Sequence, residues 1–285
     1  MRIKKAPAFF FMTLLFLPSL SFCLEVQLRL SPGLRRMRLE EVNLALAGWE
    51  ERMKLEASSQ PNWSFEGVPI PPLRSGFSFE GELTFLLSRR LALGLNAGYV
   101  FGYLNEKDTL LSITKEDAVY DYARPTKVSA TPITFLGYLY FPLGSKANFY
   151  LKGGAGIIRA RYTGREAFRR ADKTNFTYPI IDLAEASSST YLGGLGFDYK
   201  FDPFLGFFIE ATALSAVVSG FSSENKAGEK SDLYSFEEYI PALDYWQAQM
   251  RVLPQEPAGA NIRSVQKATV DFSGFSIKIG ILLKF

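Results

Sequence analysis

Side chains that could catalyse a reaction or hold a metal ion are scarce in this chain of 285 residues. It contains no histidine, and Cys23 is its one cysteine. A serine nucleophile without histidine needs a lysine or a terminal amine as its base, and the serines at 187–189 have no lysine close by in the sequence. Zinc sites are built mainly from histidine and cysteine. We therefore expect no enzymatic activity, no cofactor and no zinc site.

Carboxylates offer one further route to a metal site, because calcium prefers oxygen ligands. Glu237, Glu238 and Asp244 lie close together in a polar stretch. Acidic pairs in loops are more often simply solvated than bound to a cation. We therefore expect no metal site here either.

Charged residues that interrupt otherwise apolar stretches are the strongest candidates. Each falls on the polar row of an alternating pattern, and a period of two is typical of β-strands. If the strands close into a small barrel with the apolar row outside, these charges lie inside, where an unpaired charge is costly. We expect ion pairs among Arg29, Glu80, Glu82, Lys152, Asp198, Lys200, Glu210 and Lys278.

Two interpretations of that interior remain open. A barrel of eight strands is only just wide enough for side chains to fill it. The ion pairs would then form a plug that stabilises the barrel. Alternatively, the ion pairs rearrange and gate a narrow pore.

Arg159 and Arg161 follow an apolar row that ends at Ile157. A strand that spans a membrane needs about 9–11 residues, which places both arginines at the outer rim. Guanidinium groups bind phosphates bidentately, so both are candidates for contact with lipopolysaccharide. The alternative is a bulge that turns the arginines inward and puts Ile158 and Tyr162 on the lipid side.

The elements that must position these residues are β-strands joined in pairs by short turns. Long polar connections at 32–75, 104–127, 163–189 and 221–268 separate the pairs. Short turns at one end and long loops at the other are what a transmembrane β-barrel requires. The expected strands are Leu24–Ser31, Gly76–Leu87, Leu91–Tyr103, Val128–Phe141, Asn148–Tyr162, Thr190–Phe201, Phe204–Gly220 and Thr269–Phe285.

The first long connection contains one helical pattern. Leu39, Val42, Leu46, Trp49 and Met53 recur at spacings of three and four, which places them on one face of a helix. We expect this helix to pack across the barrel mouth as a lid. A partner-binding or lipid-surface helix is the alternative.

The first residues are typical of a secretory signal peptide. Basic residues precede an apolar run over 8–20, and Ser21 and Cys23 supply small residues for a cleavage site. We expect residues 1–23 to be removed, which leaves a barrel domain over 24–285. In the alternative, Cys23 carries a lipid anchor, although the large residue before it departs from the lipoprotein motif.

A soluble barrel of the lipocalin type would show the same alternation, with an apolar interior and charges outside. The confinement of charges to one row favours the membrane instead, because a lysine or arginine facing the lipid midplane costs about 2–4 kcal/mol. The chain is 47% hydrophobic and 15% aromatic, yet no run reaches the ~20 apolar residues of a membrane helix. The net charge of +3 gives no indication of nucleic-acid binding.

Three segments carry a family resemblance, namely Pro132 to Pro142, Tyr150 to Gly156 and the terminal Ile277–Phe285. They resemble the outer-membrane β-barrel family that includes the OmpA and OmpX barrels. This resemblance implies an all-β fold, an eight-stranded antiparallel up-and-down transmembrane barrel in the outer membrane. It also implies contact with outer-membrane lipids, including lipopolysaccharide, and with the barrel-assembly machinery. Phe285 resembles that family's assembly signal. The family fixes the fold and says little about activity.

We therefore predict a non-enzymatic outer-membrane protein, exported through a cleaved signal peptide, with a structural or surface-interaction role. A narrow channel for small or apolar solutes is the alternative.

Overall fold

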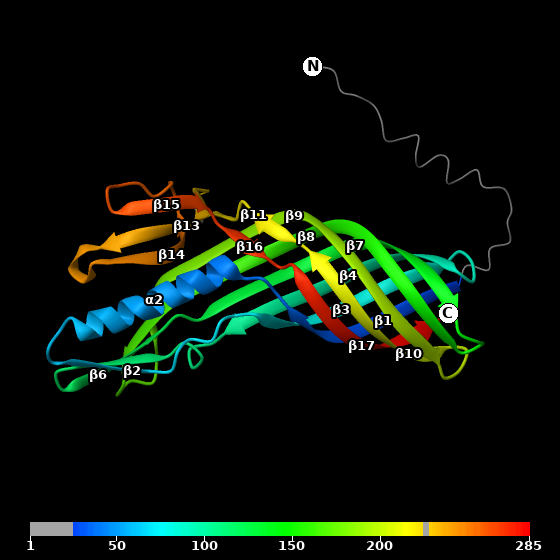
Figure 1. Cartoon of the computed structure of the whole chain (residues 1–285), viewed down its shortest axis with the longest axis horizontal. Helices are drawn as coiled ribbons and strands as arrows, with labels where there is room; N and C mark the ends of the chain where they lie inside the picture. Colours follow the sequence, from blue (N-terminus) through cyan, green and yellow to red (C-terminus); the bar gives the residue numbers. More distant parts are fainter. Residues whose placement is uncertain (1–24, 225–227) are drawn as a thin grey trace, which may run out of the picture.

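Long antiparallel strands pair side by side in a closed ring (Figure 1). The computed structural model describes residues 25–224 and 228–285, so the expected signal peptide and Cys23 lie outside the described residues. Each ring strand pairs with the next, and the last pairs with both its predecessor and the first. The ring consists of β1 (Glu25–Arg36), β3 (Ser75–Leu86), β4 (Leu91–Leu104), β7 (Thr126–Pro142), β8 (Ala147–Arg170), β9 (Thr177–Lys200), β10 (Leu205–Ser215) and β17 (Gly274–Lys284).

The predicted all-β antiparallel fold is confirmed. The two ends of the barrel differ, and we call them the turn end and the loop end. At the turn end, short turns join β3 to β4, β7 to β8 and β9 to β10, close to the C-terminus (Figure 1). The loop end carries the longer connections. No helix in the described part of the chain is long and apolar enough to cross a membrane.

The connections at the loop end are mostly strands, which corrects the prediction of long polar loops. β8 and β9 each run for 24 residues and stay paired far beyond Tyr162, so most of the expected loop at 163–189 is strand. On β8 the outward residues beyond Ile157 are polar (Arg159, Arg161, Thr163 and Arg165), so the apolar row that identified this strand stops there. The added strands are β2 (Trp63–Gly67), β5 (Leu111–Lys115), β6 (Ala118–Ala123), β12 (Ser222–Glu224), β13 (Lys230–Ile240), β14 (Tyr245–Leu253) and β15 (Ile262–Lys267).

The expected strand Phe204–Gly220 is interrupted. β10 ends at Ser215, and the short β11 (Val217–Ser219) pairs instead with β16 (Thr269–Asp271). The interruption falls at Ala216, whose N–H donates to the Ser273 hydroxyl at 2.9 Å rather than to a ladder partner.

Helix α2 (Glu40–Ser58) contains every residue of the helical pattern except Leu39, which is its N-cap residue, and the helix lies along the loop end (Figure 1). Its contacts are close on both sides. A Cβ at Gly48 would lie 2.9 Å from the backbone nitrogen of Ala248 in β14. Arg124 donates to the carbonyl oxygen of Ala45 at 3.2 Å, and the Glu50 carboxylate accepts from the N–H of Ile70 at 2.9 Å. The helix is therefore fixed to β14 and to the segments that connect β2 to β3 and β6 to β7.

Buried apolar side chains fill the loop end between α2 and the barrel strands. This cluster continues inward until it meets tyrosines from β7 and β8. The turn-end half of the interior is instead occupied by charged and polar side chains. Members of the loop-end cluster include Leu39, Val42, Leu46, Val100, Val128, Ile158, Leu214, Leu233, Met250, Val270 and Phe272.

Candidate functional site

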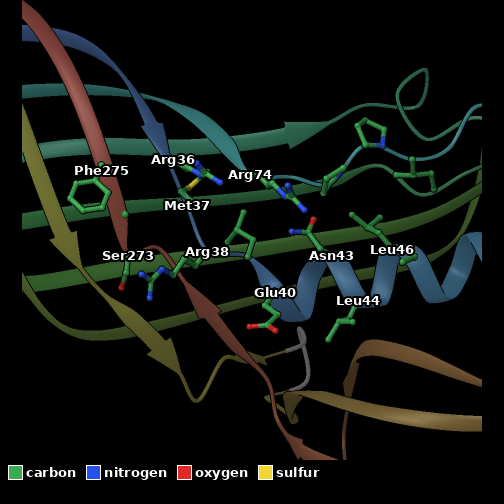
Figure 2. Close-up of a pocket in the computed structure, with 16 residues that line it drawn as sticks. Arg36, Met37, Arg38, Glu40, Asn43, Leu44, Leu46, Arg74, Ser273 and Phe275 are labelled. Atoms are coloured by element: carbon green, nitrogen blue, oxygen red, sulfur yellow. The ribbon is translucent and has the colours of Figure 1, made fainter.

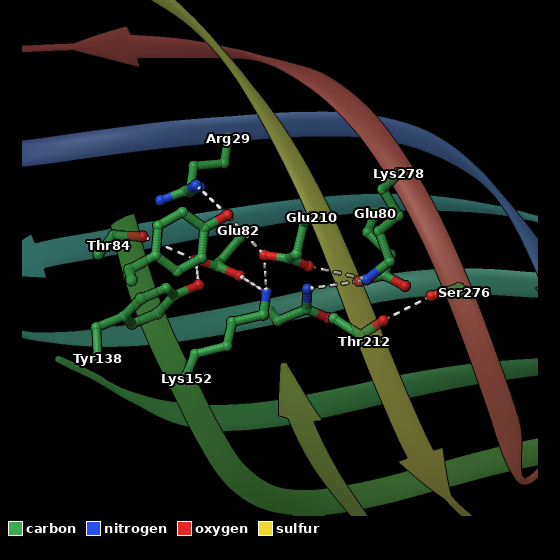
Figure 3. A network of polar contacts seen from close by, with 12 residues as sticks. Arg29, Glu80, Glu82, Thr84, Tyr138, Lys152, Glu210, Thr212, Ser276 and Lys278 are labelled. Atoms are coloured by element: carbon green, nitrogen blue, oxygen red, sulfur yellow. Dashed lines mark hydrogen bonds and ion pairs between the residues drawn. The ribbon is translucent and has the colours of Figure 1, made fainter. Parts of the chain in front are cut away.

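Two lysines and three glutamates from the four strands β3, β8, β10 and β17 form a continuous ion-pair network inside the barrel (Figure 3). The Lys152 ammonium on β8 lies 3.0 Å from Glu82 and 2.7 Å from Glu210. The Lys278 ammonium on β17 lies 2.6 Å from Glu80 and 3.3 Å from Glu210. Glu210 therefore bridges the two lysines, and both its oxygens are used. All five residues are buried.

Arg29 on β1 occupies the next layer toward the turn end. Its guanidinium donates to the hydroxyls of Tyr140 at 3.1 Å and Tyr150 at 2.6 Å. It also lies over the rings of Tyr150 and Phe208, each at 4.4 Å from the centroid. Asp198 is 3.9 Å away and supplies the opposite charge. Tyr150 in turn donates to Glu210 at 3.0 Å, which joins this layer to the lysine network.

Neutral donors also bind the carboxylates of Glu80 and Glu82. Thr84 donates to Glu82 at 2.9 Å, and Tyr138 makes a short hydrogen bond to the same carboxylate. Asn96 donates to Glu80 at 3.0 Å. A buried carboxylate is tolerated when its lone pairs are filled in this way.

Small residues make room for these side chains. Glu80 stands opposite Gly98 of β4, where a Cβ would lie 2.8 Å from the glutamate Cγ. Glu210 stands opposite Gly196 of β9, where a Cβ would collide with the Tyr150 hydroxyl. The charged layer therefore depends on glycines at facing positions.

The charged layer is tightly packed. The cavity among Arg29, Glu82, Lys152 and Glu210 measures only about 10 Å³, which is the minimum that could hold a single water molecule. The apolar cluster lies on the loop-end side of this layer. Hydroxyl, ammonium and carboxylate groups here are bound to one another, so the arrangement favours a rigid filling over a reactive centre.

The structure brings together seven of the eight residues expected in the interior network. Lys200 is the exception, because it is the last residue of β9 and forms no ion pair in the described part of the chain. Arg35 takes the place of a fourth cation and lies 3.2 Å from Glu80. Sequence reasoning missed Arg35 because the first strand was expected to end at Ser31. The same alternation, carried on from Arg29, would have found it.

The outward row of every barrel strand carries exposed large apolar side chains, which we call the apolar belt. Phe135 is 71% exposed and Phe275 is 70% exposed. Exposed apolar area around a whole barrel is far more than the few hundred Å² that a soluble monomer shows. The arrangement contradicts the lipocalin-type alternative, which buries this row. The belt comprises Leu30, Leu34, Phe77, Phe79, Leu83, Leu91, Leu93, Leu95, Ile133, Phe135, Leu139, Leu151, Ile157, Tyr191, Leu195, Ile209, Phe275, Ile277, Ile279 and Ile281.

Arg159 and Arg161 point outward just beyond the belt, so β8 has no bulge that turns them inward. Ile158 on the opposite face is buried. Both guanidinium groups bind Glu185 of β9: Arg159 donates to it at 3.2 Å through Nε, and Arg161 at 2.7 Å through Nε. Hydrogen bonds from Arg161 and Arg159 lower the pKa of Glu185 below its usual value. One carboxylate thus offsets part of this positive charge.

The remaining sequence candidates lie apart from the barrel interior. Phe285 is exposed at the turn end, where its N–H donates to the carbonyl oxygen of Val26 at 2.9 Å. Glu237 pairs with Arg263, and Asp244 accepts from Tyr239 at 2.7 Å. The described ranges contain no group of three or more histidine, cysteine, aspartate or glutamate residues arranged to hold a metal ion.

The fold and the site together define a closed antiparallel β-barrel with an ion-paired interior and an apolar exterior. No protein-family model and no curated protein matches this chain. Among solved structures, the chain is similar to the outer membrane protein OprG from Pseudomonas aeruginosa. That match has 13% identity and a TM-score of 0.43, and it covers 92% of this chain and 95% of OprG.

It is also similar to Ail, the attachment invasion locus protein of Yersinia pestis, in its complex with the heparin analogue sucrose octasulfate. That match has 8% identity and a TM-score of 0.38, and it covers 92% of this chain and 99% of Ail.

Proposed function

We propose that this chain is an outer-membrane protein whose eight-stranded barrel spans the bilayer with a plugged interior. It has no enzymatic activity and acts structurally or through the segments at its loop end. The apolar belt carries this proposal, because it surrounds the barrel at the height where the charged network fills the inside. Hydrocarbon is the solvent that accommodates such an exterior.

The ion pairs favour a plug over a pore. Each lysine in the network contacts two carboxylates, and Glu210 contacts both lysines. Opening a path would break several buried pairs together, each of which is costly to break. The apolar cluster beneath α2 would also have to be displaced.

Outer-membrane lipids are the proposed surroundings of the belt, and the barrel-assembly machinery is the proposed partner during biogenesis. Arg159 and Arg161 lie just beyond the belt, and in the proposed orientation their guanidinium groups would be near lipopolysaccharide phosphates, which such groups bind well. Because both already bind Glu185, we expect their contribution to lipid binding to be small.

Insertion and conductance test the two parts of the proposal separately. The refolded chain should insert into lipid vesicles and show no steady conductance in planar bilayers. A steady unitary conductance from the wild-type chain would favour the narrow-channel alternative.

Phe135→Lys tests the assignment of the belt. Phe135 is 71% exposed in the middle of the belt, and a lysine there should cost about 2–4 kcal/mol of barrel stability in a bilayer. The matched control is Leu143→Lys, since Leu143 is 59% exposed in the turn after β7, outside the belt. Equal insertion and stability of the two variants would contradict a lipid-facing belt.

A further inference from the structure

Three arginines line a groove at the loop-end edge of the apolar belt (Figure 2). The groove has a volume of about 710 Å³ and lies between the end of β1, the start of α2 and the start of β17. Arg36, Arg38 and Arg74 are exposed, and none of them forms an ion pair within the part of the chain that the structure describes. They are therefore available to a ligand.

Strand pairing holds the arginines together. Arg36 stands opposite Ser75 in the β1–β3 ladder, which brings Arg74 alongside it. Arg38 forms an isolated backbone bridge to Asp271. Gly274 closes the third side, and a Cβ there would collide with the carbonyl oxygen of Arg36. The backbone positions of the arginines are thus fixed by the barrel.

The acidic residues nearby do not neutralise this charge. The Glu41 carboxylate accepts hydrogen bonds from the N–H of Thr269 at 3.0 Å and from the Thr269 hydroxyl at 2.6 Å. Asp271 accepts from the N–H of Ser273 at 2.8 Å. Glu40 is the one acidic residue that lines the groove. Three guanidinium groups and one carboxylate in the lining leave an excess of positive charge.

The groove opens directly onto the belt. Phe275, which lines it, is 70% exposed, and Leu34 and Ile277 continue the apolar row toward the turn end. β1 has 12 residues, which at ~3.3 Å each and a tilt of about 40° rise roughly 30 Å. Arg36 therefore lies just beyond an apolar band of about 25 Å, at the height of the outer headgroups.

We propose that Arg36, Arg38 and Arg74 bind the phosphate of an anionic lipid in the outer leaflet, with an acyl chain along Phe275 and Leu34. The proposal rests on the outer-membrane location proposed above. Guanidinium forks bind phosphate bidentately, and the apolar row accepts the chain. A free phosphate ion would use only the arginines.

Binding of bisphosphorylated lipid A to the refolded protein in phosphate-free maltoside micelles tests this site. The wild-type chain should bind it more tightly than enzymatically dephosphorylated lipid A or inorganic phosphate. Affinity in the variant Arg36→Gln/Arg38→Gln/Arg74→Gln should fall by about tenfold or more, because hydrogen bonds between charged groups are lost. The matched control, Arg159→Gln/Arg161→Gln, should change affinity about twofold or less, because Glu185 already occupies those arginines.

Heat-modifiable migration on gels shows separately whether each variant is folded, so a failure of the barrel is distinguishable from a failure of the site. Unchanged affinity in the folded triple variant would overturn the proposal. So would an equal loss in the control variant, or wild-type binding that does not discriminate against the dephosphorylated lipid. Inorganic phosphate that binds as tightly as lipid A would overturn the lipid assignment.

Discussion

Removal of Glu210 is the sharpest test of the interior network. Its carboxylate contacts Lys152 at 2.7 Å, Lys278 at 3.3 Å and the Tyr150 hydroxyl at 3.0 Å, and the residue is 2% exposed. Breaking a buried pair from one side costs about 3–5 kcal/mol. Both lysines keep a second carboxylate, so we expect Glu210→Leu to cost about 3 kcal/mol, at the lower end of that range.

The measurement is the free energy of unfolding in urea for barrels refolded into vesicles. Glu185→Gln is the matched control, since its ion pairs lie on the outer surface and should contribute about 1 kcal/mol or less. Glu210→Leu leaves the network with one excess positive charge, and the double variant Glu210→Leu/Lys152→Met removes that excess, so part of the lost stability should return. A cost below about 0.5 kcal/mol for Glu210→Leu would refute the conclusion that the network is buried and coupled.

Two further predictions concern the loop end. Hydrogen bonds from Arg161 and Arg159 lower the pKa of Glu185 in the folded protein. The ionised carboxylate should therefore contribute fully to the free energy of unfolding above its unfolded pKa near 4.5. That contribution should be lost as the pH falls through the folded pKa. The stability difference between wild type and Glu185→Gln at pH 7 should therefore vanish at low pH, and a difference that persists there would contradict this. Gly48→Val should push α2 away from the backbone of Ala248, which limited proteolysis of the helix would detect; unchanged protection would show that the packing tolerates the side chain.

Much of the fold could be predicted from the sequence because side-chain parity is a local property. Within one strand, successive residues point to opposite faces, so Glu80 and Glu82 share a face with each other and not with Phe79. The same argument placed Lys278 inside and Phe275 outside, and the structure agrees. The helical period of residues 39–53 is equally local.

The pairing partners could not be predicted in the same way. Whether Lys152 meets Glu82 or another carboxylate depends on the stagger between strands far apart in the sequence, and alternation within one strand carries no information about stagger. Lys200 falls on the same row of alternating residues as the network, but it is the last residue of β9 and forms no ion pair in the described part of the chain. The sequence pattern also changed where β8 and β9 leave the belt, so the paired extension at 163–189 was missed.

The sequence by itself thus determined which side chains face in and which face out, because that depends on a repeat of two residues. Only the tertiary structure decided which side chains contact one another inside the barrel and on its outer surface. Closure of β17 onto β1 brings Lys278 to Glu80. The pairing of β1 with β3 brings Arg36 beside Arg74. These contacts join residues distant in the chain, and they exist only once the barrel has closed in one register.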